Sequence, residues 1–130
     1  MRVSKTLGID KERKVNPIFN SNGQVVAWQN DENIYNLNGS HAAVINDDNV
    51  YGHSGQHLGI FTNGLFRDHN GGAVAFLQGA TGGPMLPLAS IPPIPPIPAI
   101  PPIPAIPSIP PIPAIPSLGW GLNWEQFINA

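Results

Sequence analysis

A repeat of 16 residues constrains this chain more than any other feature of its sequence. Four glycines, each preceded by Asn or Ser and set between two short apolar runs, recur at this spacing: Gly23, Gly39, Gly55 and Gly71. Such dipeptides supply the positive φ angles that two-residue type I′ hairpin turns require. We therefore predict four β-hairpins of one design between Ile18 and Leu77, giving eight short antiparallel strands.

Pairing across these turns predicts which positions of the repeat share a face of the sheet. Position 1 of the four repeats is Ile18, Ile34, Val50 and Phe66. A two-residue turn places position 2 opposite position 9 and position 1 opposite position 10. Positions 2, 9 and 11 then share one side, and positions 1, 10 and 12 share the other. One hairpin cannot bury a core alone, so we predict an all-β fold in which four hairpins surround a pseudo-fourfold axis and share one core.

Beyond the last repeat the period changes from 16 to three. Nine consecutive Ile-Pro-X triplets run from Ile91 to Ser117, with X being Pro, Ala or Ser, and the same frame includes Met85, Leu88 and Leu118. Polyproline II has three residues per turn, so this spacing places all the aliphatic side chains on one edge. A solvated linker has no need of Ile at every third position. We predict an ordered polyproline II tail whose edge packs on the domain or on partner chains through Ile91, Ile94, Ile97, Ile100, Ile103, Ile106, Ile109, Ile112 and Ile115.

The length of this tail limits where it can go. Residues 85–118 span about 100 Å at roughly 3.1 Å per residue, whereas a compact unit of about 70 residues has a diameter near 30 Å. The domain therefore cannot cover a straight stripe. We expect the tail to wrap the domain in broken segments, with burial against other chains as the alternative and a solvated spacer as the remaining interpretation.

The two ends of the chain differ from the middle in composition. Residues 1–15 hold five of the six basic residues, and a solvated leader is favoured over an arm that binds phosphate or acidic lipid, because this charge is small. In the last segment Asn123 is expected to cap a short helix, and Trp120, Trp124 and Phe127 are expected to pack onto the domain rather than dock freely. We therefore divide the chain into a basic segment (1–15), a four-hairpin domain (16–84), the tail (85–118) and an aromatic C-terminal anchor (119–130).

Few residues offer chemistry. His41 and His57 share position 8 of the repeat, and His53 and His69 share position 4. Neutral imidazoles suit Zn²⁺, but no spacing for four ligands is present and the chain has no Cys. Polar residues beside turns explain these histidines equally well. We predict no metal site and no cofactor.

A second polar cluster lies at the last hairpin turn. Arg67, Asp68 and His69 are consecutive, and they could bind an anion or serve catalysis. A structural bond from Arg67 to Asp68 or to a neighbouring turn is the favoured interpretation. No nucleophile, base and oxyanion arrangement is recognisable, so we predict a protein that is not an enzyme.

Charge and hydropathy exclude further classes. The net charge is −2 and only 11% of residues are charged, which argues against a nucleic-acid binder. No apolar run is long enough for a transmembrane helix, and the basic leader lacks the apolar stretch of a secretory signal. The cytoplasm is therefore the default location.

Three short motifs carry a resemblance to a known family. They are G-x-H-L-G at Gly55–Gly59, R-D-H-x-G at Arg67–Gly71 and G-G-P at Gly82–Pro84. With the period-three tail and the final W-x-x-x-W-E-Q-F, the chain resembles the bacterial 4-fold β-flower proteins from Ile18 to Ala130. The resemblance implies four hairpin petals around a pseudo-fourfold axis and no established activity. Tails of that family often carry Lys or Arg, where this chain has Pro, Ala or Ser.

These observations favour a structural or interaction module that uses its Ile edge for self-association or for a protein partner. The alternative is a binder of a small apolar ligand or lipid at the open end of the flower, since pockets gather at barrel mouths. An enzyme or metal protein that uses Arg67, Asp68 and His69 is a third interpretation.

Overall fold

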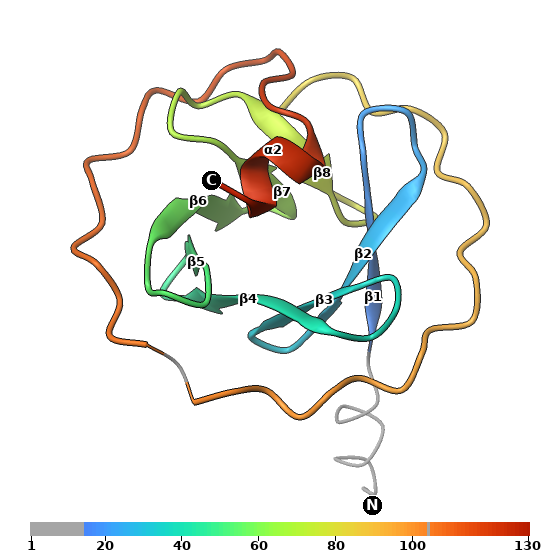
Figure 1. Ribbon diagram of the computed structural model, residues 1–130. Helices are drawn as coiled ribbons and strands as arrows, with labels where there is room; N and C mark the ends of the chain where they lie inside the picture. The colour runs from blue at the N-terminus through green and yellow to red at the C-terminus, as the bar shows by residue number, and fades with distance from the viewer. Residues whose placement is uncertain (1–14, 104) are drawn as a thin grey trace, which may run out of the picture.

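Eight antiparallel strands form one closed barrel in a computed structural model that describes residues 15–103 and 105–130. Each strand pairs with its neighbours in sequence, and the order runs once around the barrel (Figure 1). This confirms the all-β prediction of four consecutive hairpins. All but the last residue of the basic segment predicted at 1–15 lies outside the described residues. The strands are β1 (Asn16–Phe19), β2 (Val25–Asn30), β3 (Asn33–Asn36), β4 (His41–Asn46), β5 (Asn49–Tyr51), β6 (His57–Thr62), β7 (Leu65–Arg67) and β8 (Ala73–Phe76).

The barrel closes through a short seam. β1 and β8 are joined by the single register pair Phe19 and Phe76, whose rings stack with centroids 5.3 Å apart. Each of the other neighbouring strand pairs has three or four register pairs. The first and last hairpins therefore meet at the least extensive junction of the sheet.

The predicted type I′ turns at the four repeat glycines are wrong. In the first hairpin the Gly23 N–H donates to the Asn20 carbonyl and the Asn20 N–H donates to the Gln24 carbonyl, both at 2.9 Å. Only the glycine has a positive φ, so the loop is a three-residue type I turn with a glycine bulge. The side chain of Asn20 favours this form, because its Oδ1 accepts the N–H groups of Asn22 and Gln24.

The two consecutive positive φ angles that define a type I′ turn occur instead in two of the connections between repeats. Asp47 and Asp48 have φ of 55° and 68°, and Asn63 and Gly64 have φ of 54° and 80°. Asn, Asp and Gly tolerate this region best. The tight two-residue turns therefore join successive repeats rather than the strands within one repeat.

The glycine bulge also changes which side chains face the core. The register shifts between positions 1 and 2 of every repeat, so that position 2 lies opposite position 8 instead of position 9. Position 9 thereby turns inward, and Leu58 and Val74 join the core. Positions 2, 8 and 11 face outward. The predicted pairing of position 1 with position 10 is confirmed at Ile18–Ala27, Ile34–Ala43, Val50–Gly59 and Phe66–Ala75.

The short helix predicted near the C-terminus is present and fills the core. Helix α2 (Trp124–Ile128) begins at Asn123, whose side chain accepts the Gln126 N–H at 2.8 Å. Trp124 and Phe127 pack on Phe66, with ring centroids 5.5 Å and 6.3 Å away. A Cβ atom on Gly59 would collide with the Arg67 carbonyl oxygen and would also lie 2.6 Å from the Phe127 ring, which explains why position 10 of that repeat has no side chain. Figure 1 shows α2 lying within the outline of the barrel.

Among the described residues, no helix has the length and apolar character needed to cross a membrane.

Candidate interaction surface

The tail runs around the barrel as a nearly complete ring (Figure 1). Its described residues between Met85 and Ser117 form neither helix nor strand. The tail therefore follows the wrapping path that we favoured from its length. Its polyproline II conformation stays a prediction.

Four backbone hydrogen bonds attach the tail to the barrel at equal intervals. Each joins a tail N–H to the carbonyl of a repeat glycine, at 2.8–2.9 Å: Ser90 to Gly23, Ala99 to Gly39, Ser108 to Gly55 and Ser117 to Gly71. The tail advances nine residues for each 16-residue repeat. At about 3.1 Å per residue, nine residues extend roughly 28 Å, which is one quarter of a ring about 110 Å around.

Sequence reasoning missed these four tail residues, although the sequence carries their signal. In every group of three triplets the third X residue is Ser or Ala and never Pro, because proline has no N–H to donate. A period of nine is therefore superimposed on the period of three.

The repeat glycines have a second role in docking the tail. Their φ angles lie between 78° and 92°, which disfavours any side chain. A Cβ atom on Gly55 would also lie 2.3 Å from the Ile106 carbonyl oxygen, and one on Gly39 would lie 2.8 Å from that of Ile97. The same residues thus shape the hairpin loops and admit the tail backbone.

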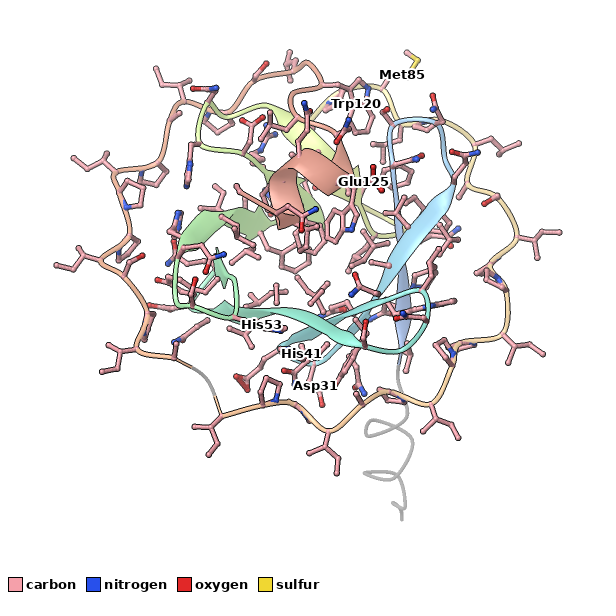
Figure 2. All side chains as sticks on the ribbon, in the orientation of Figure 1. Asp31, His41, His53, Met85, Trp120 and Glu125 are labelled. Carbon is pink, nitrogen blue, oxygen red and sulfur yellow. The ribbon has the colours of Figure 1, made fainter. Side chains whose placement is uncertain are left out.

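The aliphatic edge of the tail faces away from the barrel. The nine isoleucines are 89–95% exposed, and Met85, Leu88 and Leu118 are 94%, 95% and 76% exposed. Figure 2 shows tail side chains, Met85 among them, pointing outward around the ring. The prediction that this edge packs on its own barrel is wrong, because the tail N–H groups must face the barrel to reach the glycine carbonyls. We call these twelve outward side chains the aliphatic ring.

Arg67 joins the two ends of the ring. Its guanidinium is 2% exposed and donates to the carbonyls of Gly82 at 2.8 Å, Ser117 at 2.8 Å and Gly71 at 2.7 Å. Gly82 precedes the tail, and Ser117 directly precedes its last residue, Leu118. The bond to a neighbouring turn that we favoured for Arg67 is therefore present, and its partners are backbone carbonyls.

Asp68 fixes the segment that leads into α2. Its Oδ1 accepts the N–H groups of Asn70 and Gly72, and its Oδ2 accepts the Leu122 N–H at 2.9 Å. The Ala73 N–H donates to the Gly119 carbonyl, and Trp120 pairs with Ala73 in a parallel bridge. The three consecutive residues Arg67, Asp68 and His69 thus have separate hydrogen-bond partners. They do not converge on one site.

The four histidines form two equivalent pairs on the outer face. Nδ1 of His41 lies 2.9 Å from Nε2 of His53, and Nδ1 of His57 lies 2.9 Å from Nε2 of His69. Because the Asn33 amide oxygen can only accept, the His41 Nε2 beside it carries a proton, and Nδ1 of the neutral ring accepts from His53. Burial, and then the neighbouring histidine, lowers the pKa of His41 and of His57.

These pairs offer two nitrogens each as metal ligands. Among the described residues, no third His, Cys, Asp or Glu joins either pair in a group that could hold a metal ion. At the corresponding positions another repeat pair carries Val25 and Leu37, which line a common hollow. An apolar pair therefore substitutes for the imidazoles in the same fold.

The comparisons with known proteins agree with this architecture. The model of the family described as 4-fold beta flower protein matches residues 16–128. No curated protein and no solved structure matches the chain significantly. The family match covers the barrel, the tail and helix α2. The chain therefore belongs to the family of 4-fold beta flower proteins.

Proposed function

We propose that this protein is a non-enzymatic interaction module that associates with further copies of itself through the aliphatic ring. The observation that supports the proposal is the exposure of the nine isoleucines, which is at least 89%. Soluble monomers rarely present large contiguous apolar surfaces, and those that do use them as interaction sites. The tail is attached through its backbone, so these side chains have no role in holding the tail to the barrel.

The spacing of the ring favours a second copy as the partner. Three polyproline II residues extend about 9 Å, and packed apolar side chains approach within about 4–4.5 Å. A row of isoleucines from another ring therefore fits between those of the first. No charged residue lies between Met85 and Leu118, so like-charge repulsion does not oppose the contact. Each buried Ile contributes roughly 1.5–3 kcal/mol before ordering costs.

The curvature of the ring makes each contact small. A convex ring touches another only along one arc, and successive repeats present similar arcs. Several weak contacts to several neighbours would therefore hold an assembly together, as in other multivalent systems. The alternative, a small apolar ligand or lipid bound at the open end of the flower, has less support, because Trp124 and Phe127 of α2 belong to the core.

Light scattering over a range of protein concentrations tests this proposal. We expect the parent to exceed the monomer mass of 13.8 kDa as concentration rises. Ile97→Lys and Ile109→Lys each disrupt one arc of the ring, so each should lower the mass at a given concentration without lowering Tm, since these side chains are 93% and 92% exposed. Leu37→Lys is the matched control, because Leu37 is 49% exposed and lies outside the ring.

Two results would contradict the proposal. A parent that stays monomeric at every concentration would exclude self-association. A Tm loss in dilute, monomeric Ile97→Lys would mean that Ile97 stabilises its own chain instead.

A further inference from the structure

In three of the four repeats the outer face of the barrel and the tail enclose a niche, and the niches differ greatly in volume. Each lies beneath the tail beside the side chain at position 11, which is Trp28, Val44 or Ile60. The cavity volume is about 10 Å³ at Trp28, about 860 Å³ at Val44 and about 210 Å³ at Ile60. The cavity beneath the tail is therefore larger where the side chain at position 11 is smaller.

The first and fourth repeats fill this space with the chain's own aromatic rings. Trp28 is 3% exposed and lies against Tyr35, Pro96 and Pro98. Phe76 is 2% exposed and belongs to a cluster with Trp120 and the tail residues Leu86 and Ala89. The space beneath the tail thus accepts an indole or a phenyl ring.

The second repeat keeps the frame of that space and lacks the ring. Tyr51 stands where Tyr35 stands in the first niche, and Pro107 stands where Pro98 stands. Two substitutions enlarge it: Val44 replaces Trp28, and Ala105 replaces Pro96. The resulting cavity falls within the range of about 300–1,000 Å³ that is typical of small-molecule sites.

Polar groups of the niche favour a cationic substituent. Glu32, Asn33, His41, Asn46 and His53 line the cavity together with the apolar residues. Figure 2 shows His41 and His53 between the barrel and the lower arc of the tail. Arg67 is the single Lys or Arg among the described residues, and its guanidinium is bonded to the ring ends. Among the described residues, the lining of this niche therefore includes one carboxylate, that of Glu32, and no Lys or Arg.

We propose that the niche between Val44 and the tail residues Pro101–Ile103 and Ala105–Pro107 binds a small planar aromatic amine. The ring occupies the space that Trp28 fills in the first repeat, stacked between Tyr51 and the proline rings. The ammonium group lies toward Glu32 and the amide oxygens of Asn33 and Asn46. This proposal is independent of self-association through the aliphatic ring.

Fluorine NMR with 5-fluorotryptamine tests the site on the full chain. We expect saturable binding at one site and weaker binding of 5-fluoroindole-3-acetate, which has the same ring and the opposite charge. Val44→Trp, which copies the first repeat, should weaken tryptamine binding by at least about tenfold, because the added ring fills the cavity. Val44→Ile copies the third repeat and should have an intermediate effect. Leu37→Trp adds the same ring outside the niche and should leave binding unchanged.

The graded series keeps the test decisive if Val44→Trp fails to fold, because Val44→Ile and Val44→Phe then replace it. Equal affinity of parent, Val44→Ile and Val44→Trp would overturn the proposal, since the probe would bind elsewhere. Equal affinity for the amine and the acetate would overturn the assignment of an amine. A parent that binds neither probe, while Val44→Trp abolishes assembly, would show that the niche takes an aromatic side chain of another protein chain, which also overturns it.

Discussion

The barrel and the tail are both rich in aliphatic residues, yet they place them on opposite sides. Position 1 of the barrel repeats is 0% exposed in all four copies, whereas the tail isoleucines are at least 89% exposed. In the barrel, neighbouring strands satisfy the backbone, so the side chains decide which face turns inward. In the tail, one N–H group in every nine residues donates to the barrel, and those few bonds decide which edge turns inward. The backbone hydrogen bonds thus orient the tail, and the aliphatic side chains are left on the edge that faces away from the barrel.

The largest effect should come from breaking the connection between the two regions at Arg67. Arg67→Met removes the donor from three carbonyls, including those of Gly82 and Ser117, and we expect the free energy of unfolding to fall by about 3–5 kcal/mol. A lysine can donate to fewer of these carbonyls, so the free energy of unfolding of Arg67→Lys should lie between those of the parent and of Arg67→Met. Urea denaturation measures all three proteins. If Arg67→Met were as stable as the parent, the Arg67 bonds between the two ends of the tail would contribute nothing to stability.

Separating the two roles of the repeat glycines should give the next largest effect. Gly55→Ala meets both an unfavourable φ of 84° and the Ile106 carbonyl, so we expect a loss of about 2–4 kcal/mol. Gly79→Ala has the same φ problem, at 86°, with no atom within 4 Å of the new Cβ, and should lose only about 1–2 kcal/mol. Thermal and urea denaturation of both variants give the difference. Equal losses of stability would mean that the tail backbone at Ile106 moves away from a Cβ atom on residue 55 at no cost in free energy.

Removing one tail N–H tests the period of nine directly. Ser108→Pro deletes the donor to the Gly55 carbonyl and should destabilise by about 1 kcal/mol. Ala114→Pro is the matched control, because Pro96 stands at the equivalent place in the first repeat, and this variant should be as stable as the parent or slightly more so. If both prolines were equally tolerated in a Tm measurement, the tail bonds would contribute nothing to stability.

A smaller effect concerns the histidine pairs, which join neighbouring hairpins of the barrel. The folded state lowers the pKa of His41 and His57, so the unfolded state binds more protons below the ordinary histidine value of about 6.5. This stabilising contribution is complete above that pH and is lost as the pH falls toward the lowered pKa. The double variant His41→Val with His53→Leu, which copies Val25 and Leu37, should reduce the Tm decrease between pH 7.5 and 5. The variant His69→Gln retains the His41 pair and serves as a comparison. An unchanged pH profile in the double variant would contradict this role.

The smallest expected effect is that of zinc. Each pair supplies two nitrogens and gains no third ligand from the part of the chain that the structure describes, so micromolar Zn²⁺ should leave the Tm of the parent unchanged. A stabilisation that His53→Ala abolishes would identify a metal site at the first histidine pair.

The sequence predicted the parts of this fold that depend on local pattern. The 16-residue spacing of glycines, the pairing of position 1 with position 10 and the Asn123 cap all follow from the properties of adjacent residues. The loop type does not, because Asn-Gly fits both a type I′ turn and a type I turn with a glycine bulge. The side chain of Asn20 and the approach of the Leu88 carbonyl to Gly23 select the second form. That one-residue difference moved position 9 to the other face.

The tail shows a different limit of sequence reasoning. A period of three identifies an edge and contains no information on whether the edge faces inward or outward. The residues that settle it are Ser90, Ala99, Ser108 and Ser117, whose N–H groups contact the barrel. The niche at Val44 was also missed, since its volume depends on the tail lying across position 11.

The joining of the tail ends at Arg67 has a kinetic consequence. The seam between β1 and β8 has a single register pair, so we expect the barrel to open there first, and Leu86 and Ala89 at the start of the tail pack against Phe19 and Phe76 at that seam. The Arg67 bonds to Gly82 and Ser117 hold the two ends of the tail together, and they must break before β1 and β8 can separate. If these bonds form after the rate-limiting step of folding, they slow unfolding more than they accelerate folding. Lifetime, rather than equilibrium stability alone, is then the property that a short proline segment and a single guanidinium confer on a small barrel.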